Sequence, residues 1–274
     1  MTDTEDAGPG NARRAFAQLK QVEARCLEVV RPIYVIEGRR APQHLGCGVL
    51  VSAEHATFVL TAAHVMDEAA GRQLAIAGAQ HPTYLIGRTS VSLVPEGQRR
   101  EDDDIDAAVI QLSDECADAL ACHPLETNEL AHYEDVEPAG AHLLIMGFPA
   151  ARQMNSLDVA TKNLNRSHIK ALGIRASASV YESAGLDERL HVLMRLQREN
   201  AITERGRRTI PKLDGMSGCG IWLIQGLALS AEASRVSPTA KLVGIFTDYR
   251  DRATLAFGPR LQQHVGMIVH LLRS

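Results

Sequence analysis

The sequence contains no run of about eighteen apolar residues, the shortest stretch that indicates a membrane-spanning helix. Its first ten residues are acidic and small, without the basic start and apolar centre of a secretory signal. Aromatic residues make up only 4% of the chain, so aliphatic side chains and alanine must form its core. We therefore expect a globular protein that stays in the cytoplasm and does not enter a membrane.

Strong charge and clustered metal ligands are also missing. The formal net charge of −4 provides no general attraction for nucleic acid or an anionic membrane surface. The five cysteines have no metal-ligand spacing, and neither His-Glu-x-x-His nor Cys-x-x-Cys occurs. We expect no metal and no cofactor. The odd cysteine count favours free thiols in a reducing compartment.

Short apolar runs separated by turn residues dominate the remainder of the chain. One series occupies residues 32–112 and a second occupies residues 142–257. Each series, with around six strands, predicts a small antiparallel barrel. In the second series, alternating apolar residues from Leu172 to Val180 predict one half-buried strand from His168 to Tyr181.

Helical periodicity brackets these two series. Apolar residues recur at three- and four-residue steps from Asn11 to Val30 and again from Pro259 to Leu272, and Asp114–Leu120 predicts a short helix between the series. The amino-terminal helix is interpreted as a brace for the barrels rather than a partner site. The expected division is a disordered tail plus helix over 1–30, a first barrel over 31–135, a second barrel over 136–258 and a helix over 259–274.

One glycine-rich loop carries a candidate nucleophile. In Gly215-Met216-Ser217-Gly218, a serine lies between glycines just before the apolar run from Ile221 to Ile224. Glycines permit backbone angles that aim successive N–H groups at one point, as an oxyanion hole requires. A serine hydroxyl is a weak nucleophile, however, and needs a base with an orienting carboxylate.

Both partners occur upstream. Leu60-Thr61-Ala62-Ala63-His64 ends an apolar run on a histidine, and Asp106 opens the run Ala107-Ala108-Val109-Ile110. The neighbouring Asp102, Asp103 and Asp104 are alternative candidates for the acid. Asp106 is favoured because the apolar strand follows it directly, whereas choosing Asp104 would put Asp106 inside that strand.

Three motifs in the order histidine, aspartate, serine resemble the chymotrypsin/trypsin-like serine protease family over residues 31–258. The resemblance implies an all-β double barrel with the site in the cleft between the barrels. It implies that His64 is the general base, Asp106 orients it and Ser217 attacks. The backbone of Gly215, Met216 and Ser217 would form the oxyanion hole. An α/β-hydrolase fits less well, because Cys219 replaces the last glycine of its nucleophile motif and the triad order differs.

Departures from the family pattern concern activation and specificity. Met216 stands where secreted members carry the acid that pairs with a new amino terminus, so activation by clipping is not expected. Pro211 occupies the position of trypsin's specificity acid. Thr247 falls where a hydroxyl supports the catalytic carboxylate, and Asp248 and Tyr249 would line the pocket entrance, which leaves side-chain preference open.

The sequence therefore predicts a serine endopeptidase that acts on peptides or proteins. By analogy it would be a regulated intracellular processing or defence protease, with a regulatory protein partner. Two alternatives remain open: a protease-like scaffold that binds peptides without cutting them, and an esterase that uses the same triad. Cys219, close to the nucleophile, is interpreted as a small buried hydrophobe, with redox sensitivity as the alternative.

Overall fold

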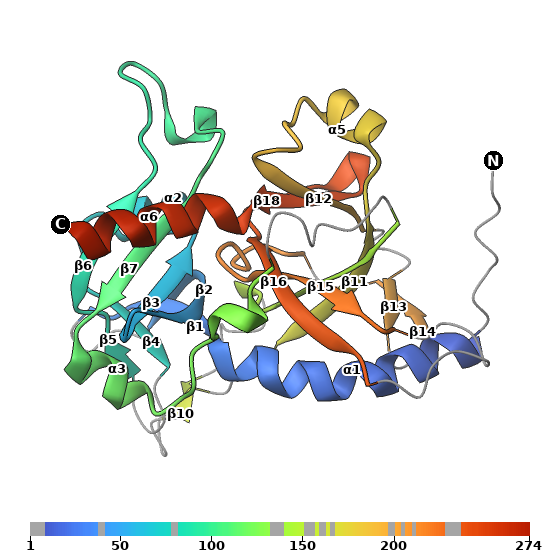
Figure 1. Ribbon diagram of the computed structural model, residues 1–274, viewed down its shortest axis with the longest axis horizontal. Helices are drawn as coiled ribbons and strands as arrows, with labels where there is room; N and C mark the ends of the chain where they lie inside the picture. The colour runs from blue at the N-terminus through green and yellow to red at the C-terminus, as the bar shows by residue number, and fades with distance from the viewer. Residues whose placement is uncertain are drawn as a thin grey trace.

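The computed structural model describes residues 9–37, 42–77, 82–131, 140–150, 157–158, 163–164, 168–196, 201–203, 206–209, 212–227 and 237–274 (Figure 1). Three sequence predictions lie wholly or partly outside these residues: the disordered tail over 1–10, the barrel boundary at residue 135, and the place of Pro211. No described helix is long and apolar enough to cross a membrane.

The first half of the chain forms a seven-stranded antiparallel sheet, in the order β5-β4-β1-β2-β3-β7-β6. Its strands are β1 (Val30–Val35), β2 (Gln43–Ala53), β3 (Ala56–Thr61), β4 (Leu74–Ala77), β5 (Pro82–Tyr84), β6 (Gly87–Val91) and β7 (Ala108–Leu112). All seven overlap the series of apolar runs that the sequence predicts over residues 32–112. The central strands β1, β3 and β7 are almost fully buried, which explains their continuous apolar character.

The second half forms another seven-stranded antiparallel sheet, in the order β16-β15-β8-β11-β12-β18-β17. Its strands are β8 (His142–Gly147), β11 (Ile169–Arg175), β12 (His191–Arg195), β15 (Gly220–Gln225), β16 (Thr239–Ile245), β17 (Asp248–Arg250) and β18 (Leu255–Pro259). Two short pairs accompany it, β9 (Leu157–Asp158) with β10 (Asn163–Leu164) and β13 (Ala201–Thr203) with β14 (Gly206–Arg208). The two sheets confirm the expected all-β chymotrypsin-like class, with seven strands in each rather than six.

One predicted strand ends earlier than expected. The alternation from Leu172 to Val180 indicates a continuous strand, but β11 stops at Arg175 and α5 (Ala178–Ala184) follows it. Alanine and glutamate are good helix formers, and Gly185, with φ +68°, closes this helix in the left-handed conformation. Val180 and Tyr181 are buried on this helix in a hydrophobic cluster, so tertiary packing outweighs alternation there, and the prediction was wrong over those residues.

The helices extend this two-sheet frame. They are α1 (Pro9–Val29), α2 (Ala63–Ala69), α3 (Asp114–Leu120) and α6 (Leu261–Arg273), with 3₁₀ turns η1 (Arg100–Asp102), η2 (Thr127–Glu129) and η5 (Asp251–Ala253). In Figure 1, α1 runs along the lower side of the molecule and α6 crosses beside β6 and β7. The amino-terminal, central and carboxyl-terminal helices all match sequence predictions.

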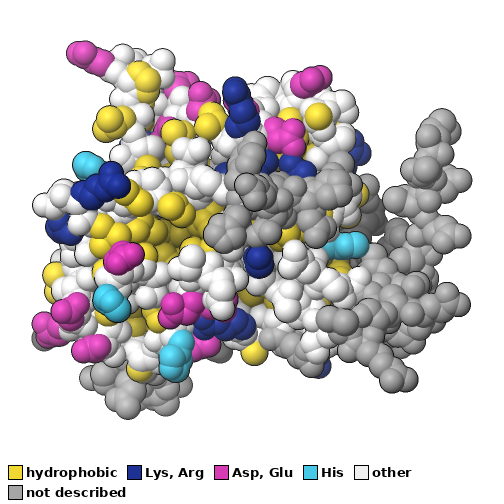
Figure 2. All heavy atoms as spheres, in the orientation of Figure 1, with side chains coloured by type: hydrophobic (Ala, Val, Ile, Leu, Met, Phe, Trp, Pro, Cys, Tyr) yellow, Lys and Arg dark blue, Asp and Glu magenta, His cyan; other side chains and the backbone are white. Residues whose placement is uncertain are grey.

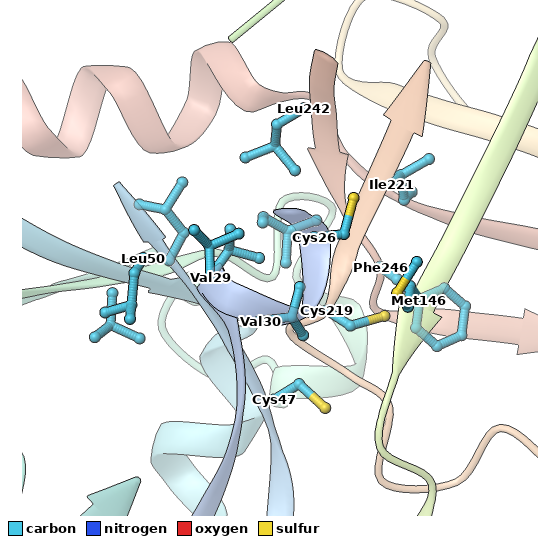
Figure 3. Packing of buried hydrophobic residues seen from close by; sticks show 14 of the residues in the cluster. Cys26, Val29, Val30, Cys47, Leu50, Met146, Cys219, Ile221, Leu242 and Phe246 are labelled. Atoms are coloured by element: carbon cyan, nitrogen blue, oxygen red, sulfur yellow. The ribbon is translucent and has the colours of Figure 1, made fainter. Parts of the chain in front are cut away.

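Helix α1 packs as a brace. Its apolar side, including Leu19, Val22 and Cys26, belongs to the same buried cluster as both sheets. Figure 3 shows Val29 and Val30, at the junction of α1 and β1, among side chains from the two halves of the chain. Arg25 of α1 also holds Glu129 of η2 at 2.7 Å. The amino-terminal helix is thus part of the core.

The surface carries mixed charge. On the face seen in Figure 2, Lys and Arg side chains are interspersed with Asp and Glu side chains.

The described residues include no group of three or more His, Cys, Asp and Glu side chains arranged to hold a metal ion.

Candidate active site

Strand pairing brings His64 and Asp106 to one edge of the first sheet. His64 lies in the first turn of α2, three residues after the end of β3, and Asp106 lies two residues before the start of β7. These strands are antiparallel neighbours, with Thr61 opposite Ala108. In an antiparallel pair the end of one strand lies beside the start of the next, so the two side chains meet.

The histidine and the aspartate are joined by two hydrogen bonds. His64 Nδ1 lies 2.7 Å from Asp106 Oδ2, and the backbone N–H of His64 donates to Oδ1 over 2.9 Å. The carbonyl of Asp106 also accepts from the N–H of Ala63 at 3.3 Å. A carboxylate at Nδ1 fixes the tautomer that carries its proton there, which leaves Nε2 as a proton acceptor.

The electrostatic surroundings favour a charged His64. Burial lowers the pKa of the imidazole, and the hydrogen bond and negative charge of Asp106 raise it. The charges of Glu68 and Asp248 add to it, so the pKa of His64 lies above its usual value of 6.5. The ring is therefore a stronger base than a free imidazole.

Ser217 lies on a tight loop that leads into β15. Gly215 and Gly218 have φ values of +80° and +90°. A Cβ atom at Gly218 would lie 1.9 Å from the carbonyl oxygen of Cys47, so this position needs glycine for both space and conformation. The N–H of Cys47, in β2, donates to the carbonyl of Ser217 over 2.7 Å. The loop of the second sheet is thereby tied to the first.

One cavity of about 490 Å³ is shared by the three predicted catalytic residues. His64, Asp106 and Ser217 all line it, together with Thr247 and Asp248. The Ser217 hydroxyl donates to the carbonyl oxygen of Thr247 over 3.0 Å. The predicted histidine, aspartate and serine are thus gathered around the same space.

Two backbone N–H groups of the Gly215 loop make no hydrogen bond to the described residues. The N–H of Met216 donates to Leu213 O at 2.9 Å, whereas no described residue accepts a hydrogen bond from the N–H of Gly215 or Ser217. The Met216 side chain is fully buried in the apolar core. It contributes packing to that core.

A second cavity, of about 220 Å³, opens beside Ser217. Three of the predicted substrate residues, Thr247, Asp248 and Tyr249, line it. The Thr247 hydroxyl donates to Phe257 O over 3.4 Å, and the described residues show no hydrogen bond between that hydroxyl and Asp106. Sequence reasoning missed three charged residues of this cavity: Lys212, Asp214 and Asp251. The position of Asp214 in the Ser217 loop was the available signal.

Two cysteines lie beneath the loop. Cys219 is fully buried, and burial raises the pKa of its thiol well above the usual value. Burial likewise raises the pKa of Cys47 to about 12. Such thiols are protonated and poorly nucleophilic at neutral pH. The hydrophobic interpretation of Cys219 is the one that these surroundings support.

Comparison with known proteins adds the family. The family model described as Trypsin matches residues 31–184, more than half of the 274 residues. The chain belongs to the trypsin family. It is therefore a serine protease by family. The matched segment contains His64 and Asp106 and ends before Ser217.

Solved structures show the same fold. Mouse neuropsin, a serine protease expressed in the limbic system of the brain, matches with a TM-score of 0.56 and 16% identity, over 89% of this chain and 94% of that chain. A Glu endopeptidase matches with a TM-score of 0.49 and 14% identity, over 89% of each chain. No match was found among curated proteins. At these identities the likeness to neuropsin concerns the trypsin-family fold.

Proposed function

We propose that this trypsin-family protein is a serine endopeptidase that cleaves peptide bonds through Ser217, His64 and Asp106. The observation that carries the proposal is the 2.7 Å contact between His64 Nδ1 and Asp106 Oδ2 at the wall of a cavity that Ser217 also lines. The raised pKa of His64 supports the same assignment, because a general base works best when its pKa lies near the operating pH.

In the proposed reaction, His64 Nε2 accepts the Ser217 hydroxyl proton while Oγ bonds to the peptide carbonyl carbon. Asp106 holds the ring and stabilises its charged form. His64 then returns the proton to the leaving amine as the C–N bond breaks, which leaves an acyl ester on Ser217. Water, activated by the same imidazole, hydrolyses this ester and releases the acid.

We assign the oxyanion hole to the loop Gly215-Met216-Ser217, with the N–H groups of Gly215 and Ser217 as the donors. Two observations support this role: neither N–H has an acceptor among the described residues, and the positive φ of Gly215 requires glycine. Loss of one such donor costs about 3 to 4 kcal/mol of transition-state stabilisation in other serine proteases.

The peptide substrate would lie along β17, which is the edge strand of the second sheet. An extended peptide can pair with such an edge as an added antiparallel strand. Asp248 and Tyr249 belong to this strand and line the cavity beside Ser217. The N–H of Tyr249 donates to Asp248 Oδ1 over 2.7 Å. In the bound state, a carbonyl of the peptide would replace Asp248 Oδ1 as the acceptor of this N–H. We keep Pro211 as a pocket residue on sequence grounds alone.

The proposed setting is the cytoplasm. All five cysteines are free, four of them buried, as expected in a reducing compartment. The buried Met216 favours control by a partner protein over activation by clipping, in a processing or defence role. We also retain the proposed barrel division at residues 31–135 and 136–258.

The experiment is peptide-library cleavage by wild type, Ser217→Ala and the control Ser183→Ala. Ser183 lies in α5, where its hydroxyl bonds to Val180 O at 2.9 Å. Cleavage by wild type and Ser183→Ala, and none by Ser217→Ala, would support the proposal. Turnover of activated esters without peptide cleavage would favour an esterase. Peptide binding without turnover of either substrate would favour a non-cutting scaffold.

A further inference from the structure

Asp106 has an unusual backbone conformation. Its φ of +44° lies in the left-handed region, which residues other than glycine adopt where the surrounding structure holds them there. In this conformation its carboxylate reaches both the N–H and Nδ1 of His64, while its carbonyl accepts from Ala63. The turn therefore needs support on both sides of Asp106.

The preceding side of the turn is held by Asp103. Its side chain is only 4% exposed, although it belongs to a run of acids in a surface loop. One carboxylate oxygen, Oδ1, accepts from the N–H of Ile105 at 3.0 Å. Asp103 thus holds the backbone of Ile105, the residue immediately before the left-handed Asp106.

The following side is held by Ser92. Its hydroxyl accepts from the N–H of Ala107 at 3.1 Å and donates to Asp103 Oδ2. The Ser92 N–H in turn donates to the carbonyl of Ala107 over 2.8 Å. Asp103 and Ser92 are bonded to each other, and together they contact the backbone immediately before and after Asp106.

Arg100 connects this pair to the helix that carries His64. Its Nη1 lies 2.6 Å from Asp103 Oδ2, and its Nε lies 2.6 Å from Asp67 Oδ2 in α2. The Asp67 side chain is half-exposed, so solvent screens that contact. The buried contact with Asp103 is the stronger of the two.

These contacts keep Asp103 ionised. Burial alone would raise the pKa of its carboxyl, but the Ser92 hydroxyl, the N–H of Ile105 and the Arg100 guanidinium lower it. The net pKa lies below its usual value of 3.8. Asp103 is therefore an acceptor for all of its partners at neutral pH.

We propose that Asp103 is a positioning residue of the protease reaction, which with Ser92 and Arg100 fixes the turn that presents Asp106 to His64. The inference rests on the proposed function of the His64–Asp106 pair. Asp103 acts through Asp106 and has no proton-transfer role of its own. This role separates two of the four nearby acids: Asp106 orients the histidine, and Asp103, three residues earlier, is buried beside it.

The test compares Asp103→Asn with the matched control Asp102→Asn. Asparagine turns an N–H group toward partners that are themselves donors, so the turn should loosen. Asp102 lies in the same loop with an exposed side chain, and its replacement removes the same charge. The first measurement is the His64 pKa, from NMR titration of the imidazole protons, with the His64 signal assigned by its absence in His64→Gln.

We expect a lower His64 pKa in Asp103→Asn than in wild type and Asp102→Asn, because Asp106 no longer opposes the effect of burial. We expect kcat to fall by about 100-fold, the scale of a 1 Å misplacement, with KM close to the wild-type value. The acid limb of the kcat/KM profile should move to lower pH in Asp103→Asn alone. A general loss of folded protein would lower the amplitude without moving that limb.

An unchanged His64 pKa and kcat in folded Asp103→Asn would overturn the inference. If that variant does not fold, Ser92→Ala decides in its place, since it removes the hydroxyl between Asp103 and Ala107 but keeps the carboxylate. The same direction of change in Ser92→Ala supports the inference, and wild-type values in it would refute it. The NMR titration does not require activity, so it tests the role of Asp103 by itself. Wild type that cleaves no peptide would contradict the proposed function and leave the titration result as a separate finding.

Discussion

The hydroxyl of Ser217 donates to the carbonyl oxygen of Thr247 over 3.0 Å. This contact gives the proposed nucleophile a resting partner on the second sheet, while His64 and Asp106 are already joined on the first. Catalytic hydrogen bonds are often absent or long before substrate binds. Attack on a peptide would require the Ser217 side chain to turn from Thr247 toward His64, within the cavity that these residues share.

Activity should decline in acid with a midpoint above pH 6.5. His64 must be neutral to accept the Ser217 proton, and its pKa is raised from 6.5, mainly by Asp106 acting against burial. A raised pKa means that the base is lost at a higher pH than for a free imidazole. The measurement is kcat/KM for a peptide substrate between pH 4 and 9. A midpoint below pH 6.5 would contradict the assignment of His64 as the base.

Gly215→Ala should lower kcat by about 10²- to 10³-fold, the effect of losing one oxyanion donor. The new Cβ would lie 2.8 Å from Ala150 Cβ and 2.9 Å from His44 Nδ1, so the loop must shift. Gly185→Ala is the matched control, because Gly185 also has a positive φ but its Cβ would meet nothing within 4 Å. An equal loss of kcat in the two variants would show that the strain of alanine at a positive φ, and not the position in the Ser217 loop, causes the loss.

His264 should make the fold less stable in acid. The ring is fully buried, its Nε2 lies 3.0 Å from Thr61 O, and burial lowers its pKa to about 4. The unfolded chain binds a proton below pH 6.5 whereas the folded chain does not until about pH 4. The free energy of unfolding therefore decreases as the pH falls from 6.5 to about 4, by about 3 kcal/mol in total.

Urea unfolding at pH 7 and pH 4.5 measures this loss. His264→Gln should show a smaller decrease between the two pH values than wild type. His270→Gln, an exposed site on the same helix α6, should behave as wild type does. The same decrease in all three proteins would show that other groups cause the acid sensitivity.

Thiol reagents should leave activity intact. Cys122 is half-buried, whereas Cys26, Cys47, Cys116 and Cys219 are buried. Iodoacetamide at pH 7.5 should therefore label Cys122 first, as peptide mapping would show, without loss of turnover. Inhibition by the reagent or by an oxidant that disappears in Cys219→Ala would reverse this expectation and give Cys219 a redox role.

The fold was predictable from the sequence because local patterns and tertiary structure agree over most of the chain. Asp114–Leu120 was predicted at the observed bounds of α3, and its Ser113 hydroxyl accepts the N–H of Cys116 as an N-cap. Where they disagree, the prediction failed: the alternation from Leu172 to Val180 predicts one strand to Tyr181, but β11 ends at Arg175 and α5 follows. Val180 and Tyr181 are buried on that helix, and this packing is not encoded in the alternation.

The supporting residues of the site were less predictable. Four acids in positions 102 to 106 look alike in sequence, and Asp106 is predicted from the strand that follows it; the structure places its carboxylate against His64. The burial of Asp103 depends on Ser92 and Arg100, whose approach is a tertiary event that no local pattern encodes. Asp251 lines the cavity beside Ser217 because the turn η5, which follows β17, brings it there. This is also a tertiary contact that no local pattern encodes.

The most direct test of the central claim is the rate at which a fluorophosphonate modifies wild type and His64→Ala, with the adduct located by mass spectrometry. We predict a single adduct on Ser217 in wild type and a rate lower by about 10²- to 10⁴-fold in His64→Ala, the usual contribution of a general base. Equal rates in the two proteins, or modification at another residue, would contradict the account.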